Sequence, residues 1–206
     1  DDVPVAVAER SVSATVAEND IRTPLSSGTS PNDGNADGSF TGDPGQSRGP
    51  AQVSGSLATL VSFGADGAGA NGFGLATDFT ALASQNLSSK GAGLSYTVSG
   101  NTLTATAGTG DAARTVFTLE LQPNGNYTFR LFDQLDHATG QGANSLALDL
   151  SSVIRATDAD GDALTLSQGF TLNVTDDVPK LDGWKPAGGT VEEEALPGGN
   201  REWPNL

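Results

Sequence analysis

The chain of 206 residues contains no cysteine and no methionine. Without cysteine it forms neither a disulfide framework nor a thiolate metal site. Lys and Arg number only ten against 25 Asp and Glu, and the resulting net charge of −15 excludes a binder of nucleic-acid phosphates. No apolar run reaches about 18 residues, the length expected of a membrane-spanning helix. The sequence therefore indicates an acidic protein that neither binds nucleic acid nor spans a membrane by a helix.

Residues for common enzyme sites are also scarce. His137 is the only histidine, and a single histidine beside an aspartate is more often a turn or packing residue than a catalytic base. The sequence has no Gly-x-Ser-x-Gly nucleophile elbow and no His-Glu-x-x-His zinc motif. The composition does not exclude a carboxylate pair for glycoside hydrolysis, but such a pair would need an apolar cleft lined by aromatic residues, which make up only 6% of the chain. We therefore predict that the protein is not an enzyme and has no catalytic residues.

What the chain has in excess is aspartate and glycine. Eighteen of its acidic residues are Asp, and 27 residues are Gly. Asp competes with the helix backbone for hydrogen bonds, so solvated helices prefer Glu. A chain rich in Asp and Gly is typical of turns and of calcium sites built from oxygen ligands.

An internal repeat organises the chain. The tetrapeptide Asp-Asp-Val-Pro occurs at residues 1–4 and again at 176–179, an offset of 175 residues. At the same offset, Thr-Val-Ala-Glu at 15–18 matches Thr-Val-Glu-Glu at 190–193. Two matches at one offset indicate a tandem array. Because the chain starts with neither Met nor a signal peptide, we expect it to be a slice of a longer one.

The repeat predicts the domain organisation. Residues 1–179 are expected to form one full unit, and 180–206 the linker and first strand of the next. Residues 23–50 are rich in Gly, Pro, Ser, Asn and Asp and are expected to be a long insertion loop. Such a loop in a compact domain is a surface insertion or a functional segment.

The body of the unit is predicted to be β-strands. Residues 114–122 alternate, with Phe117, Leu119 and Leu121 on one face, and Asn124-Gly125 then predicts a hairpin turn in which both residues have positive φ. A second hairpin is expected around Gly-Asn at 100–101. Further strands are predicted at 11–16, 53–63, 94–99, 102–107, 145–156 and 164–175, and the only possible short helix at 75–87. Many short strands separated by turns favour an all-β sandwich.

Asp158-Ala-Asp160-Gly-Asp162 is the strongest candidate site. Three carboxylates at alternate positions around a Gly can direct several oxygens onto one cation, and calcium takes six to eight such ligands at about 2.3–2.6 Å. An EF-hand loop would need Gly at its sixth position and Glu at its twelfth, where this chain has Ala163 and Gly169. The motif therefore predicts a calcium site that is not an EF-hand.

Other acidic residues lie where one unit would meet the next. A sandwich places its chain ends and end loops at two poles, so these carboxylates are expected to converge on the junction. There they would form calcium clamps that stiffen the linker between units. The alternative is that the linker is a charged, flexible hinge. Asp66, in a Gly-rich segment, is a weaker candidate. The full set of predicted calcium ligands is Asp158, Asp160, Asp162, Asp176, Asp177, Asp2, Glu18, Asp20, Asp66 and Glu193.

Four sequence segments together resemble the tandem extender repeats of giant bacterial RTX adhesins, which type I secretion exports. They are "ATDADGDALTLSQGFTLNVTDDVP" at 156–179, "FGADG" at 63–67, "LDH" at 135–137 and "TVEEEALPGGN" at 190–200. The resemblance implies an Ig-like or cadherin-like β-sandwich that takes up calcium outside the cell. Glu18, the 158–162 loop and Asp176-Asp177 look like the early Glu, the Asp-x-Asp loop and the acidic linker of cadherin repeats. The Gly-Gly-x-Gly-x-Asp nonapeptide of RTX β-rolls is absent.

The resemblance leads to a functional hypothesis. We expect a calcium-binding stalk module of a cell-surface adhesin that serves adhesion and biofilm formation, with neighbouring units of the same chain as partners. One alternative is a calcium-dependent lectin for surface polysaccharide, with the 23–50 loop in its site. Another is a fibre subunit that assembles head to tail by adding residues 190–196 to a neighbouring sheet edge.

Overall fold

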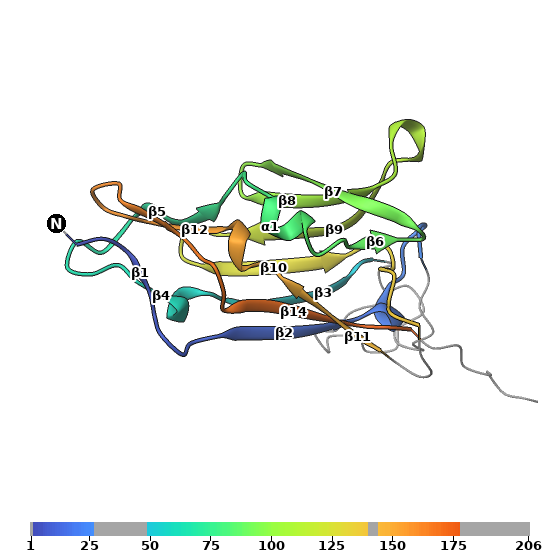
Figure 1. Ribbon diagram of the computed structural model, residues 1–206, viewed down its shortest axis with the longest axis horizontal. Coiled ribbons are helices and arrows are strands. Elements are labelled where there is room, and N and C mark those ends of the chain that lie inside the picture. Colours follow the sequence, from blue (N-terminus) through green and yellow to red (C-terminus); the bar gives the residue numbers. More distant parts are fainter. Residues whose placement is uncertain (1, 27–48, 140–143, 178–206) are drawn as a thin grey trace, which may run out of the picture.

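The computed structural model describes residues 2–26, 49–139 and 144–177 (Figure 1). These residues form strands joined by short 3₁₀ turns and a single turn of α-helix. The strands are β1 (Val5–Ala6), β2 (Val12–Ala17), β3 (Ala51–Ser56), β4 (Val61–Ser62), β5 (Ala68–Leu75), β6 (Ser88–Ser89), β7 (Ala92–Ser99), β8 (Thr102–Ala107), β9 (Arg114–Leu121), β10 (Asn126–Leu131), β11 (Ser145–Asp149), β12 (Ile154–Asp158), β13 (Ala163–Thr165) and β14 (Phe170–Thr175). The helical elements are η1 (Glu18–Asp20), η2 (Ala58–Leu60), α1 (Thr80–Ala83), η3 (Gly110–Ala112) and η4 (Ser151–Val153).

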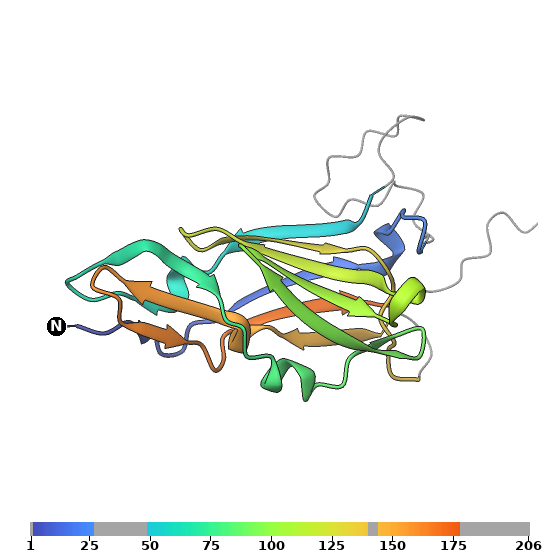
Figure 2. The ribbon, with the colours of Figure 1, turned by 90° about the horizontal axis from the view of Figure 1, so that it is seen from above.

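The strands form one large antiparallel sheet and three smaller sheets. The large sheet has the order β3-β10-β9-β8-β7-β6, and the smaller ones are β11-β14-β2, β13-β12-β5 and β1-β4. All pairs are antiparallel except β2 and β14, which run parallel, with Thr175 opposite Ala17. The strands of these sheets run broadly along the long axis of the molecule (Figures 1 and 2). This arrangement confirms the predicted all-β sandwich.

The core is the apolar face of the large sheet packed against the smaller sheets. Phe117, Leu119 and Leu121 are at most 1% exposed, as the alternation in the sequence predicts. The rings of Tyr127 on β10 and Phe170 on β14 lie 4.8 Å apart between centroids and join the large sheet to the β11-β14-β2 sheet. Burial of such apolar and aromatic side chains supplies the main driving force for folding.

The β9–β10 hairpin forms where it is predicted, but with a different turn. Only Gly125 has a positive φ, 86°, and the loop has three residues, because Gly125 N donates to Gln122 O at 2.9 Å and Gln122 N donates to Asn126 O at 2.8 Å. Pro123 fixes the φ required at the second position of a type I turn. A type I turn followed by a left-handed glycine is the usual three-residue hairpin loop.

Three predicted strands are each broken in the structure. Residues 53–63 contain η2 between β3 and β4, residues 145–156 contain η4 between β11 and β12, and residues 164–175 contain a turn between β13 and β14. At each break a leucine stays buried: Leu60, Leu150 and Leu166 are at most 2% exposed. The apolar pattern therefore continues while the chain leaves one sheet for another, and hydrophobicity alone does not reveal that crossing.

Two further expectations need correction. The possible helix at 75–87 is reduced to one turn, α1, because Asp78 N-terminal to it and Asn86 with φ 52° limit it on both sides. The strand β5 is not predicted by the sequence, since its Ala- and Gly-rich residues have low β-propensity. It forms because it pairs with β12, from Leu75 opposite Ile154 to Ala68 opposite Asp158.

The described residues place acidic groups at opposite ends of the sandwich. The turn after β12 and the turn before β5 lie at the end that carries the N-terminus, whereas η1 and the end of β14 lie at the other end (Figures 1 and 2). We call these ends the N-terminal pole and the C-terminal pole. The insertion closes at its base, where Arg22 N donates to Gly49 O at 2.9 Å. No helix in the described part is long and apolar enough to cross a membrane.

Candidate metal centres at the two poles

The 158–162 turn at the N-terminal pole gathers its three carboxylates. Asp158 ends β12, and Asp158 N donates to Asp162 O at 3.0 Å, which folds the five residues back on themselves. Gly161 takes a φ of 106°, which L side chains rarely adopt. One carboxylate oxygen from each of Asp158, Asp160 and Asp162 lies within 4.8 Å of the others. The structure therefore brings together the three residues that the sequence predicts as the main calcium ligands.

Asp158 is the anchor of this cluster. It is 2% exposed, and its Oδ1 accepts hydrogen bonds from Gly161 N at 3.0 Å and Asp162 N at 2.8 Å. Its Oδ2 is buried and has no hydrogen-bond partner among the described residues. None of the ion pairs in the described part of the chain involves these three carboxylates. A buried charged oxygen without a partner is costly, and a cation would satisfy it.

Asp2 and Asp66 lock a neighbouring turn at the same pole. Asp2 N donates to Asp66 Oδ2 at 3.0 Å, and Asp2 Oδ2 accepts from Ala65 N at 2.9 Å. Gly67 O in this turn accepts from Ala159 N at 3.1 Å, which ties it to the 158–162 turn. The predicted ligands Asp2 and Asp66 therefore lie next to the carboxylate trio, but among the described residues their own carboxylates are not part of it.

A glycine fixes the backbone under the carboxylate trio. A Cβ built on Gly69 of β5 would clash with the backbone oxygen of Asp158 and would lie 3.2 Å from Thr157 O. Real Cβ atoms do not tolerate the first contact, so only glycine allows β5 to approach β12 at this point. The Gly-rich sequence at 64–69, which leads into β5, thus has a structural role as well as supplying Asp66.

The C-terminal pole holds a second cluster, made of Glu18, His137 and Asp176. Glu18 begins η1, directly after β2, and Asp176 directly follows β14. Because β2 and β14 are parallel and in register to their last residues, the two carboxylates meet at one end. One ligand atom from each of the three side chains lies within 4.8 Å of the others. The predicted ligands Glu18 and Asp176 are therefore brought together.

Glu18 is nearly inaccessible to solvent. It is 3% exposed, and its Oε1 accepts from Leu135 N at 2.7 Å and lies 3.2 Å from His137 Nε2. Burial raises the pKa of Glu18, and the charge of Asp176 raises it further, against the opposing effect of the Leu135 N–H and of His137. A cation at this cluster would relieve both causes of the shift.

His137 is not among the predicted ligands, because a single histidine beside an aspartate is more typical of a turn or packing residue. Its side chain is 5% exposed, and its Nδ1 is buried without a hydrogen-bond partner in the described structure. The only sequence signal was that the single histidine follows an aspartate, and Asp136 in fact accepts from Ser88 Oγ and Gly91 N. His137 faces a glutamate 119 residues earlier, a contact that no local pattern encodes.

Asp133 holds the segment that leads to His137. It is fully buried and forms ion pairs with Lys90, at 2.6 Å from Nζ to Oδ1, and with Arg114, at 2.7 Å from Nε to Oδ2. Gln134 N also donates to Asp133 Oδ1 at 3.0 Å. Nothing in the sequence around this aspartate distinguishes it from the other isolated aspartates. Its network fixes the loop after β10, from which Leu135 and His137 reach Glu18.

The remaining predicted ligands have different outcomes. Asp20 and Asp177 are half-buried residues of the C-terminal pole that are not members of the cluster of Glu18, His137 and Asp176, and each has an interaction partner. Glu193 and residues 180–206 lie outside the described residues, as does most of the predicted 23–50 insertion.

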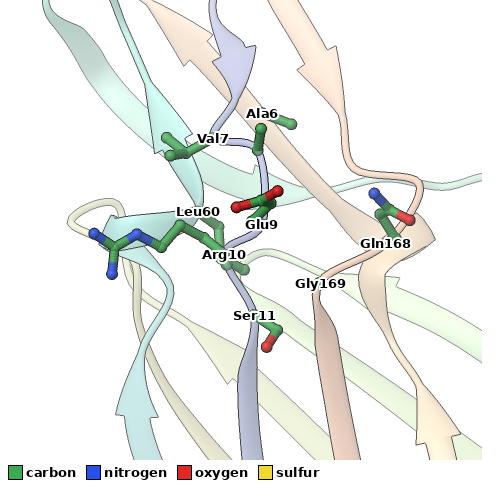
Figure 3. A pocket seen from close by; sticks show the side chains of 9 residues that line it. Ala6, Val7, Glu9, Arg10, Ser11, Leu60, Gln168 and Gly169 are labelled. Carbon is green, nitrogen blue, oxygen red and sulfur yellow. The ribbon is translucent and has the colours of Figure 1, made fainter.

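A pocket of about 510 Å³ lies where β1 turns into β2 (Figure 3). Its walls combine small apolar residues with polar ones, among them Glu9, Arg10 and Gln168, and Glu9 has a positive φ of 59°. None of the clustered carboxylates and no aromatic ring lines it. It therefore lacks the stacking surface that a sugar site is expected to have.

Comparison with known proteins gives a family and no closer relative. Neither the search of curated proteins nor the search of solved structures returned a match. The model of one family matches residues 13–169, from the second residue of β2 to the residue before β14, and so includes Glu18, His137 and the 158–162 turn. The chain therefore belongs to the family described as "Domain of unknown function (DUF5801)".

Proposed function

We propose that this chain is a calcium-binding extender module of a large RTX-type bacterial adhesin, exported by type I secretion and used at the cell surface for adhesion and biofilm formation. The observation that carries the proposal is the buried, unpartnered Oδ2 of Asp158 inside a trio of carboxylates. Carboxylates of Asp158, Asp160 and Asp162 are the hard oxygen donors that calcium prefers. Bound calcium would neutralise their mutual repulsion and hold the turn.

The repeat supports a role at the junction between units. Asp177 is the copy of Asp2 in the next unit, at the offset of 175 residues. Asp2 hydrogen-bonds the 65–66 turn beside the carboxylate trio. In an array, Asp177 would therefore contact the corresponding turn of the following unit. Asp177 directly follows Asp176, which belongs to the cluster at the C-terminal pole. Calcium at each such junction would turn a charged linker into a stiff joint.

The energetics fit folding after export. Extracellular calcium modules bind with Kd of about 10⁻⁴–10⁻³ M, so the low calcium of a cytosol leaves the carboxylates repelling one another. At 100 times Kd, one calcium site adds about 2.7 kcal/mol to the free energy of unfolding. That is a large share of the total of about 5–15 kcal/mol of a typical domain.

The test is thermal unfolding of the metal-free protein in a calcium titration. We expect millimolar calcium to raise the melting temperature of the wild type, and Asp158→Asn to abolish most of the increase while keeping an oxygen that accepts from Gly161 N. Asp111→Asn, which removes an exposed charge from η3, is the matched control and should respond like the wild type. A wild-type melting curve that millimolar calcium leaves unchanged would refute the proposal.

A further inference from the structure

We propose that Glu18, His137 and Asp176 form a second metal site that takes a first-row transition ion of the zinc class, in place of the calcium that the sequence predicts for Glu18 and Asp176. Three donors from three separate elements converge there within 4.8 Å of one another. The inference does not depend on calcium binding at the 158–162 turn.

The donor set decides between the two kinds of ion. Calcium takes six to eight oxygen ligands, whereas zinc is bound by imidazole nitrogen and carboxylate oxygen in sites with as few as three protein ligands. Imidazole suits zinc, copper, nickel and iron, while sites made of carboxylates alone suit calcium and magnesium. The trio at the 158–162 turn offers carboxylates only, and the cluster at the C-terminal pole adds His137.

The position of His137 against Glu18 supplies further support. Glu18 Oε1 and His137 Nε2 lie 3.2 Å apart, close to the separation of two atoms that each bind one zinc ion at about 2.0–2.2 Å. Nε2 is therefore the ring nitrogen that faces the cluster, and an ion there would contact both side chains. His137 Nδ1 is buried without a hydrogen-bond partner in the described structure, so the ring gives up no other contact when Nε2 binds an ion.

The surroundings hold these side chains in place before any ion arrives. Leu135 N donates to Glu18 at 2.7 Å, and Asp176 N donates to Asn144 O at 2.8 Å. The side chains of Glu18 and His137 are only 4% and 5% exposed. Fixed donors lose little conformational entropy on binding, which favours a tight site.

Because His137 is the only histidine, its ring nitrogens can be followed without interference. In the metal-free 206-residue protein labelled with ¹⁵N, we expect one equivalent of zinc to shift the imidazole nitrogen signals and millimolar calcium alone to leave them unchanged. The zinc shift should persist when millimolar calcium is present. Signals that zinc does not move, or a zinc effect that calcium reverses, would overturn the inference.

Two variants test the site by calorimetry. Asp176→Asn and His137→Gln should each weaken zinc affinity by about tenfold or more, while the calcium response assigned to the 158–162 turn stays intact and reports that the variant still folds. Asp158→Asn should do the reverse, losing the calcium response and keeping zinc. Zinc affinity unchanged in both Asp176→Asn and His137→Gln contradicts the site. Loss of the calcium response in Asp158→Asn with unchanged zinc affinity supports both proposals separately.

Discussion

The two poles carry acidic clusters of similar size that are built in different ways. At the N-terminal pole, three aspartates within five consecutive residues form the cluster, and backbone N–H groups are the main hydrogen-bond partners of Asp158. At the C-terminal pole, the three side chains of the cluster come from η1, the loop after β10 and the residue after β14, and the ion pairs of the buried Asp133 support them. One site is local in the sequence, and the other exists only through long-range packing.

This difference in construction gives the two poles different sets of donor atoms. A short turn of aspartates presents oxygen alone, and its ligands remain close together whenever the turn forms. Long-range packing instead brings a nitrogen donor next to two carboxylates and shields Glu18 and His137 from water. Changes to the C-terminal pole should therefore act on global stability as well as on metal binding, and changes to the N-terminal pole should act mainly on calcium.

The largest effect is expected from Asp133→Ala at the support of the C-terminal pole. The substitution leaves Arg114 and Lys90 without their buried partner, so the free energy of unfolding should fall by about 3–5 kcal/mol. Urea denaturation of the metal-free protein measures this loss. The partly exposed pair of Glu120 and Arg130, 3.1 Å apart, provides the control, since Glu120→Gln should cost about 1 kcal/mol or less. Equal losses of unfolding free energy in the two variants would contradict the stabilising role of the buried Asp133.

An intermediate effect is expected from Gly69→Ala at the N-terminal pole. The new methyl group would press on the backbone oxygen of Asp158, and the strand shift should cost about 1–3 kcal/mol. Calcium affinity should fall with it, because the turn that carries the carboxylates moves. Gly74→Ala on the same strand is the matched control, since its Cβ meets nothing within 4 Å. A thermal melt in calcium that cannot tell Gly69→Ala from Gly74→Ala would disprove the tight approach of β5 to β12.

A smaller effect of opposite sign is expected from Asp160→Asn. Asp160 is exposed, so removing its charge should relieve repulsion and raise the stability of the metal-free protein by about 1 kcal/mol or less. In calcium the order should invert, because the variant lacks a ligand that the wild type has. Differential scanning calorimetry with and without calcium checks the crossover. If the wild type is the more stable form in both conditions, the carboxylates of the trio do not repel one another.

The smallest effect concerns the pH dependence set by Glu18. Burial raises the pKa of Glu18 above its ordinary 4.5, so the stability that protonation of Glu18 provides is present below 4.5 and is lost as pH rises through the folded-state pKa. Glu18→Gln, which stays neutral, should therefore gain stability relative to the wild type over that range in metal-free buffer. Urea unfolding between about pH 4 and pH 8 measures the difference. A difference that does not vary with pH would contradict the raised pKa of Glu18.

Much of the fold follows from local pattern. The alternation at residues 114–121 and the return strand with Tyr127, Phe129 and Leu131 predict the β9–β10 hairpin, because a sheet with one buried face imposes a period of two. Patterns fail where the chain changes sheets at η2 and η4, since buried leucines continue through each break. The strand β5 escapes prediction because its pairing with β12, and not the character of its own residues, makes it a strand.

The candidate sites divide in the same way. Asp158, Asp160 and Asp162 are predictable because their spacing alone places three carboxylates on one turn. The repeat points to Glu18 and Asp176. Glu18 directly follows β2 and Asp176 directly follows β14, and these two parallel strands end with Ala17 opposite Thr175. His137 is not predictable, since its approach to Glu18 depends on the Asp133 network and on the bond from Leu135 N.

The sequence by itself therefore determines an acidic all-β chain, its repeat and the aspartate turn, all of which depend on composition and on residues close together along the chain. The tertiary structure alone decides that Asp2 and Asp66 lock a turn beside the trio, that Asp158 Oδ2 is buried without a partner, and that His137 joins Glu18 and Asp176. The reason is physical: strand pairing and burial bring together groups more than one hundred residues apart, and only packing removes the water that would otherwise satisfy them.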